Sequence, residues 1–129
     1  MPGSQPPEPT QAQVEQPLPQ AALADLLALF VFRRRHMRVD GFSMAPTLLP
    51  GDLVLITPMQ AEATLPALGS IVVARHPGRS STRIIKRLAE IQAGRLVLLG
   101  DNPGASTDSR QFGAVPRQLL IGVVTSVVR

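Results

Sequence analysis

Beyond residue 37 the hydrophobic pattern takes the two-residue period of β-strands. Five runs are rich in Val, Ile and Leu and are separated by Gly, Pro, Asp and Asn, the residues that usually bound strands. They are Asp52–Thr57, Gly69–Arg75, Thr82–Ile91, Arg95–Leu99 and Leu119–Val128. The residues between the third and fourth runs, 92–94, are typical of a hairpin connection.

No segment with helical period separates these strands, which argues against parallel βαβ units. The pattern therefore predicts a mostly β fold: a coiled antiparallel sheet, barrel-like, with a short N-terminal helix. The length of 129 residues suits one such domain with a tail.

The first 37 residues differ from the rest. Residues 1–20 hold six of the 13 prolines and almost nothing apolar, so we expect a disordered tail. Residues 21–32 predict a short apolar helix of about 18 Å, too short for a hydrocarbon core of about 30 Å. We therefore divide the chain into a tail (1–20), an apolar helix with a basic segment (21–37) and a folded domain (38–129).

The net charge of +4 is concentrated after this helix, where Arg33–Arg38 supplies four positive charges in six residues. A secretory signal would carry its positive charge before the apolar run. The helix either docks on the domain or lies in a membrane interface, with a peripheral contact through residues 21–38. We expect a cytoplasmic protein, membrane-associated in the second case. No aromatic residue interleaves the basic run, so we expect no nucleic-acid partner.

The composition also limits the chemistry. There is no Cys, which excludes disulfides, a cysteine nucleophile and Cys-ligated zinc. Two His residues are too few for a histidine-rich metal site, so we expect no metal and no cofactor.

Lys86 is the only lysine beside 12 arginines. On the predicted strand its side chain shares a face with Ile84 and Leu88. Burial there lowers the pKa of a lysine, and the charge of Arg87 acts in the same direction. Lys86 is thus a candidate general base; the alternative is a surface lysine that extends its ammonium group to water.

Ser43 is the candidate nucleophile that such a base would activate. Gly41 permits a positive φ angle beside it, and Pro46 restricts the chain after it. We expect the serine to be held at a strand edge with its own N–H available to an oxyanion; the alternative is an ordinary serine. A Ser-His-Asp triad is disfavoured, because there is no G-x-S-x-G motif and His76 precedes a proline in a predicted loop.

Residues 100–113 form a loop dense in short polar side chains. It lacks the spaced acids of a calcium loop. Either it is an ordinary surface loop, or it supplies a hydroxyl and a carboxylate that orient the lysine, braced by Asp108 and Arg110.

Four motifs stand in order along the chain: S-M-x-P-T-L at 43–48, G-D-x-V at 51–54, R-x-x-K-R at 83–87 and G-D-N-x-x-x-S-x-D-S-R-x-x-G-x-V at 100–115. Together they resemble the sequence boxes of the type I signal peptidase family, over about residues 38–128. The resemblance implies Ser43 as acylating nucleophile and Lys86 as general base. It implies that Ser106 hydrogen-bonds the lysine and that Asp108 and Arg110 form a supporting ion pair.

The resemblance makes Met44 and Gly41 supporting residues, with the Ser43 N–H in the oxyanion hole. Gly41 stands where some members carry a serine that adds a second donor. Family members favour small substrate side chains at P1 and P3.

Three departures qualify the resemblance: Pro103–Ala105 replaces charged or polar residues, only 12 residues separate Arg87 from Gly100, and no full-length membrane anchor precedes Ser43. In its small size and lack of a full-length anchor, the chain resembles the small proteases that mature nickel-type superoxide dismutases more than it resembles membrane-embedded preprotein peptidases. We therefore expect a serine endopeptidase that removes the leader peptide of such a precursor. The alternatives are a general signal peptidase, a self-cleaving regulator of the repressor type, for which a DNA-binding domain is missing, and a non-catalytic binding module.

Overall fold

The computed structural model describes residues 22–28, 35–60 and 63–129, and its contacts divide the chain into two units between Arg34 and Arg35. In the first unit residues 22–28 form a helix with exposed Leu23, Leu26 and Leu27, as predicted for this part of the apolar segment. The predicted tail and the remainder of the helix prediction lie outside the described residues. No described helix is long and apolar enough to cross a membrane.

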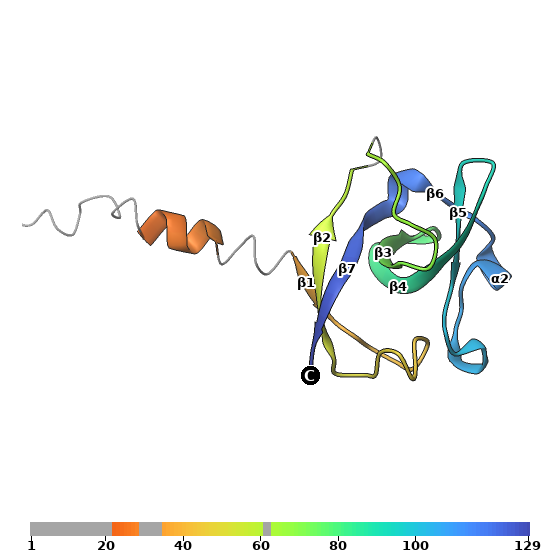
Figure 1. Ribbon diagram of the computed structural model, residues 1–129, viewed down its shortest axis with the longest axis horizontal. Coiled ribbons are helices and arrows are strands. Elements are labelled where there is room, and N and C mark those ends of the chain that lie inside the picture. Colours follow the sequence, from red (N-terminus) through yellow and green to blue (C-terminus); the bar gives the residue numbers. More distant parts are fainter. Residues whose placement is uncertain (1–21, 29–34, 61–62) are drawn as a thin grey trace, which may run out of the picture. The chain divides into compact units, whose positions relative to one another are not determined.

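The second unit is built on one antiparallel sheet of seven strands in the order β1-β2-β7-β3-β4-β5-β6 (Figure 1). The strands are β1 (His36–Arg38), β2 (Leu53–Pro58), β3 (Ile71–His76), β4 (Arg79–Gln92), β5 (Arg95–Leu99), β6 (Val115–Pro116) and β7 (Leu120–Val128). Three short helices lie late in the chain: η2 (Pro103–Ala105), α2 (Ser109–Phe112) and η3 (Arg117–Leu119). The prediction of a mostly β, antiparallel fold is confirmed.

The five predicted strands correspond to β2, β3, β4, β5 and β7, and the bounds of β5 match residue for residue. The hairpin between β4 and β5 is also confirmed, since Gln92 pairs with Arg95 across a two-residue turn. Two strands were missed, β1 and β6, because three and two residues are too few to show a period. His76 is the last residue of β3 and pairs with Arg79, so its predicted place in a loop is wrong.

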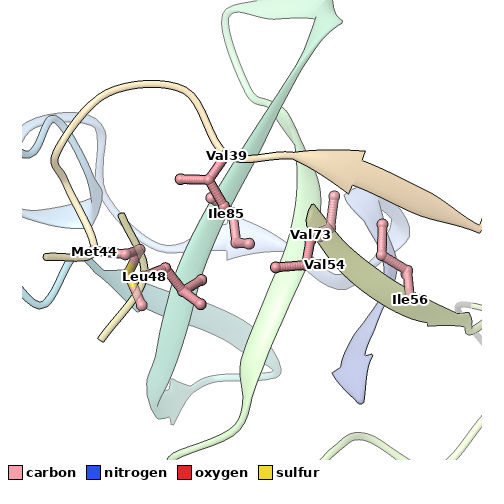
Figure 2. Packing of buried hydrophobic residues seen from close by; sticks show 7 residues of the cluster. All are labelled: Val39, Met44, Leu48, Val54, Ile56, Val73 and Ile85. Atoms are coloured by element: carbon pink, nitrogen blue, oxygen red, sulfur yellow. The ribbon is translucent and has the colours of Figure 1, made fainter. Parts of the chain in front are cut away.

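The core has two parts. The first core cluster gathers side chains from β2, β3, β4 and the connection between β1 and β2 (Figure 2). Its buried members are Val39, Met44, Leu48, Val54, Ile56, Val73 and Ile85. The second core cluster draws on β3, β4, β5, β6 and β7, and its buried members are Val72, Ala74, Leu88, Leu96, Leu98, Val115 and Leu120.

Side chains of strand β4 point alternately toward the two clusters, and this alternation determines the face of the strand on which Lys86 lies. Ile85 belongs to the first cluster, whereas Leu88 belongs to the second and Ile84 packs against it. Lys86 pairs with Val72, a member of the second cluster. Lys86 thus shares a face with Ile84 and Leu88, as the sequence predicts.

Candidate active site

A cavity of about 320 Å³ brings together the two residues singled out in the sequence. Ser43 reaches it from the connection between β1 and β2, and Lys86 from β4. The remaining wall comes from the same connection, the β3–β4 hairpin and the loop after β5. The lining residues are Asp40, Gly41, Phe42, Ser43, His76, Arg79, Ile84, Lys86, Ala105 and Thr107.

Lys86 is only 6% exposed, so the alternative of a lysine that reaches into bulk water does not describe it. Burial lowers its pKa, because the charged ammonium group loses hydration. The carboxylate of Asp108 raises the pKa and the guanidinium of Arg110 lowers it. No described residue forms a hydrogen bond with the Lys86 ammonium group. The side chain therefore has the environment that favours a free amine.

Ser43 lies in a run of turns between β1 and β2 and not at a strand edge, which corrects the prediction. Gly41, two residues earlier, has a φ angle of +80°, as expected of the glycine beside the serine. Met44, the next residue, is fully buried in the first core cluster. Packing of Met44 thus fixes the position of a serine whose own side chain faces the cavity.

Asn102 ties this connection to the loop after β5. Its backbone N–H donates to the Ser43 carbonyl oxygen at 2.8 Å, and its side-chain amide donates to the Phe42 carbonyl oxygen at 3.1 Å. Both bonds use carbonyl groups and leave the Ser43 N–H unengaged. In the described part of the chain, that N–H has no hydrogen-bond acceptor, so it is available to a ligand.

Asp108 is fully buried and caps the N-terminus of α2. Its Oδ2 accepts hydrogen bonds from the Gly100 N–H (2.8 Å), the Ser106 hydroxyl (2.6 Å) and the Arg110 guanidinium (2.6 Å). Burial by itself raises the pKa of Asp108, but these hydrogen bonds outweigh it and hold the pKa well below its usual range. The predicted ion pair with Arg110 is present.

Ser106 does not make its predicted contact in this structure. Its hydroxyl donates to Asp108, and within the described residues it forms no hydrogen bond with Lys86. A hydroxyl that donates to a carboxylate still presents lone pairs as an acceptor. The role of Ser106 toward the lysine therefore stays a prediction.

Asp101 joins three segments of the site. Its carboxylate forms two hydrogen bonds with the Arg87 guanidinium, at 2.8 and 2.6 Å, and accepts a third from the Thr47 hydroxyl at 2.6 Å. Arg87 also donates to the Gly69 carbonyl oxygen at 2.7 Å. The hydrogen bond from Arg87 is the main reason why the pKa of Asp101 is lowered. The segments that carry Ser43 and Lys86 are thus linked through one carboxylate.

Gly100 lies where the loop after β5 meets the serine segment. A Cβ atom at this position would clash with the Ser106 hydroxyl oxygen and would lie 2.6 Å from the Ser43 carbonyl oxygen. Glycine is therefore required by close approach of the backbone, and this explains the first residue of the G-D-N motif.

Ser43 and Lys86, which the sequence singled out, line one cavity, but other residues of the site were missed. Thr47, Asp101 and Asn102 belong to the quoted motifs, yet no role followed from them. His76 and Arg79 were missed as cavity residues. Their signal is the Pro-Gly dipeptide at 77–78, which marks a tight turn and would bring the two residues opposite each other.

The described ranges contain no cluster of three or more His, Cys, Asp or Glu side chains that could hold a metal ion.

Comparison with known proteins agrees with the four motifs. The model of the family "Signal peptidase, peptidase S26" matches residues 12–91 and 88–128. Mitochondrial ATP-independent inner membrane protease subunit 1a of Arabidopsis thaliana is 33% identical over 107 residues, covering 65% of this chain and 64% of the relative. Mitochondrial inner membrane protease subunit 1 of Xenopus tropicalis is 30% identical over 103 residues, covering 64% and 62%. The chain thus spans less than two thirds of the length of either relative.

Proposed function

The chain belongs to the peptidase S26 family of signal peptidases, and we propose that it is a serine endopeptidase that removes an N-terminal leader or signal-type peptide from a precursor protein. In this proposal Ser43 is the nucleophile and Lys86 the general base. The observation that carries it is that the serine lines the same cavity as a lysine that is 6% exposed.

The reaction follows from the properties of these groups. The neutral Lys86 amine takes the proton of the Ser43 hydroxyl as its oxygen attacks the scissile carbonyl carbon. The Ser43 N–H donates to the oxyanion that forms. The Lys86 ammonium then protonates the leaving amine, which leaves an ester on Ser43. A water molecule, deprotonated by the same amine, hydrolyses this ester and restores the serine.

Ser106 and Asp108 position the base in this proposal. Asp108 is fully buried and holds the Ser106 hydroxyl at 2.6 Å. With its proton directed at the carboxylate, the Ser106 oxygen keeps lone pairs with which, in this proposal, it accepts an N–H of Lys86. Arg110 neutralises the charge of Asp108, so the carboxylate raises the pKa of Lys86 less than it would alone.

Two further observations narrow the proposal, one about association with a membrane and one about the substrate. Both relatives are named as subunits of mitochondrial inner membrane proteases. We extend the association with a membrane to this chain, with a peripheral contact through residues 21–38; the exposed leucines of helix 22–28 support it. The short interval of 12 residues between the third and fourth motifs, from Arg87 to Gly100, supports the leader of a nickel-type superoxide dismutase as substrate. A general secretory precursor is the alternative.

The test uses purified full-length chain with two precursors, one carrying a nickel-type superoxide dismutase leader and one a secretory signal peptide. We expect cleavage of at least one, and a loss of about 10²- to 10⁴-fold in kcat/KM for Ser43→Ala and for Lys86→Ala. Ser81→Ala, an exposed serine on β4, is the matched control and should cleave normally.

Undiminished cleavage by either variant would show that the assigned residue is wrong. If the wild-type chain cleaves nothing and a peptide with a serine-reactive group does not label Ser43, the protein is a binding module instead. The preferred precursor decides between the two substrate classes.

A further inference from the structure

The cavity has a second polar region at the tip of the β3–β4 hairpin, four positions along β3 from the residue that pairs with Lys86. His76 ends β3 and Arg79 begins β4, and the two residues pair across the Pro-Gly turn. Both line the cavity that contains Ser43 and Lys86. The hairpin tip therefore forms part of the surface that a substrate bound at the serine would contact.

Arg79 presents a guanidinium without a partner. It is exposed, and in residues 35–60 and 63–129 no side chain or carbonyl group forms an ion pair or hydrogen bond with it. The other guanidinium groups around the site are engaged: Arg87 binds Asp101 and Arg110 binds Asp108. An arginine that lines a cavity with its five N–H donors unused is suited to bind a carboxylate.

His76 adds a second donor beside it. Its Nδ1 accepts the N–H of Gly78 at 2.9 Å, so the ring proton lies on Nε2. The ring also contacts Phe112, with the ring centroids 5.2 Å apart, which restricts its orientation. No acceptor for the Nε2 proton is found in the described part of the chain. A substrate carboxylate at Arg79 would provide one.

The acidic and basic side chains at the cavity come from different segments of the chain. Asp40 is the acidic residue of the lining and lies next to Gly41 on the serine side. It forms no ion pair with Arg79. A negatively charged side chain is therefore attracted to Arg79 and repelled by Asp40.

We propose that Arg79, with His76 beside it, binds an acidic side chain of the substrate and so selects precursors that carry Asp or Glu near the cleavage site. The inference rests on the proposed function. Lys86 pairs with Val72 and Arg79 pairs with His76, four positions further along β3, so the two side chains start about 13 Å apart at about 3.3 Å per residue. An extended substrate covers that distance with about four residues, so the acidic residue lies within about four positions of the scissile bond.

Arg83 offers a matched control on the same strand. It pairs with Arg75, is exposed, and lies on the face of Ile85, whereas Ile84 and Lys86 occupy the face toward the cavity. Arg83→Gln removes the same charge from the same hairpin without removing a contact in the cavity. It therefore separates a direct contact from the general attraction of a basic hairpin.

The experiment measures kcat/KM for peptides in which a single Glu, or a Gln as its neutral counterpart, is scanned through seven positions on each side of the scissile bond. We expect about a tenfold preference for Glu at one position or two neighbouring ones. The ratio should fall to about one in Arg79→Gln and persist in Arg83→Gln. A uniform ratio of one in the wild-type chain, or a preference that survives Arg79→Gln, would overturn the proposal.

A binding measurement makes the inference independent of turnover. The Ser43→Ala chain should bind the Glu peptide more tightly than the Gln peptide in fluorescence anisotropy, and the difference should vanish in Ser43→Ala/Arg79→Gln. If this difference appears but no peptide is cleaved by the wild-type chain, the proposed function fails and the acidic site stands. If Arg79→Gln instead reduces binding to vesicles with anionic lipids and leaves peptide binding unchanged, the hairpin contacts a membrane and the proposal is wrong.

Discussion

Thr47 donates a hydrogen bond to Asp101 at 2.6 Å across 54 positions of sequence. The same carboxylate binds Arg87, the residue after the proposed base. Thr47 follows the proposed nucleophile by four positions. The distance between nucleophile and base is therefore set by a hydrogen-bonded bridge as well as by the packing of the core.

Breaking this bridge should reduce activity more than stability. We expect Asp101→Asn to lower kcat/KM by about tenfold and the free energy of unfolding by about 1 kcal/mol, because a partly exposed ion pair contributes modestly. Thr47→Val should have a smaller effect in the same direction. Glu90→Gln is the control, since Glu90 is exposed on β4 and bonds only to Gln92 among the described residues. Equal kcat/KM for Asp101→Asn and the wild-type chain would contradict a positioning role.

Gly100 should not tolerate a side chain. We expect Gly100→Ala to lower the free energy of unfolding by about 1–3 kcal/mol, because its Cβ would press against Ser106 and the Ser43 carbonyl oxygen. In Gly104→Ala the nearest atom would lie 3.9 Å from the new Cβ, an ordinary contact, so its stability should stay within about 0.5 kcal/mol of the wild type. Urea unfolding of both variants provides the comparison. A Gly100→Ala protein as stable as Gly104→Ala would show that the loop can move away.

Met44 should connect core packing with the position of Ser43. We expect Met44→Ala to cost about 2–5 kcal/mol, since it removes a fully buried side chain. The fraction that remains folded should also cleave more slowly, because the serine loses its fixed neighbour. Leu49→Ala, at a side chain that is 44% exposed, serves as control with little effect. Thermal unfolding and active-site titration together separate folded protein from active protein.

The pH dependence of cleavage should follow the ionisation of Lys86. The neutral amine is the reactive form, so kcat/KM should rise with pH as Lys86 loses its proton. This rising limb of the pH profile should lie below the ordinary lysine pKa of 10.5, because burial lowers the pKa of Lys86. Arg110 lowers this pKa and Asp108 raises it. Arg110→Gln should therefore move the limb to higher pH, and Asp108→Asn to lower pH.

The two variants are expected to move the limb in opposite directions, so together they separate an electrostatic effect on Lys86 from a structural one. A purely structural effect of losing the ion pair would lower the rate at every pH without moving the limb, or would move it in one direction for both variants. Circular dichroism at each pH shows whether the proteins stay folded. A limb that does not move in either variant would mean that another group is being titrated.

The sequence by itself determined the features that depend on neighbouring residues. Alternation of side chains along a strand placed Lys86 on an apolar face, and the two-residue period located β2, β3, β4, β5 and β7. The order of the four motifs indicated the family. These properties could be predicted because the period of a strand and the burial of its side chains are recorded locally.

Only the tertiary structure decided which distant residues meet. The cavity, the bridge from Thr47 to Asp101 and the pairing of His76 with Arg79 depend on how strands from different parts of the chain are aligned. Ser43 was expected at a strand edge but lies among turns, because Met44 is drawn into the core and Asn102 binds the carbonyl groups of Phe42 and Ser43. Contacts of this kind arise from packing between segments far apart in sequence, and no local pattern records them.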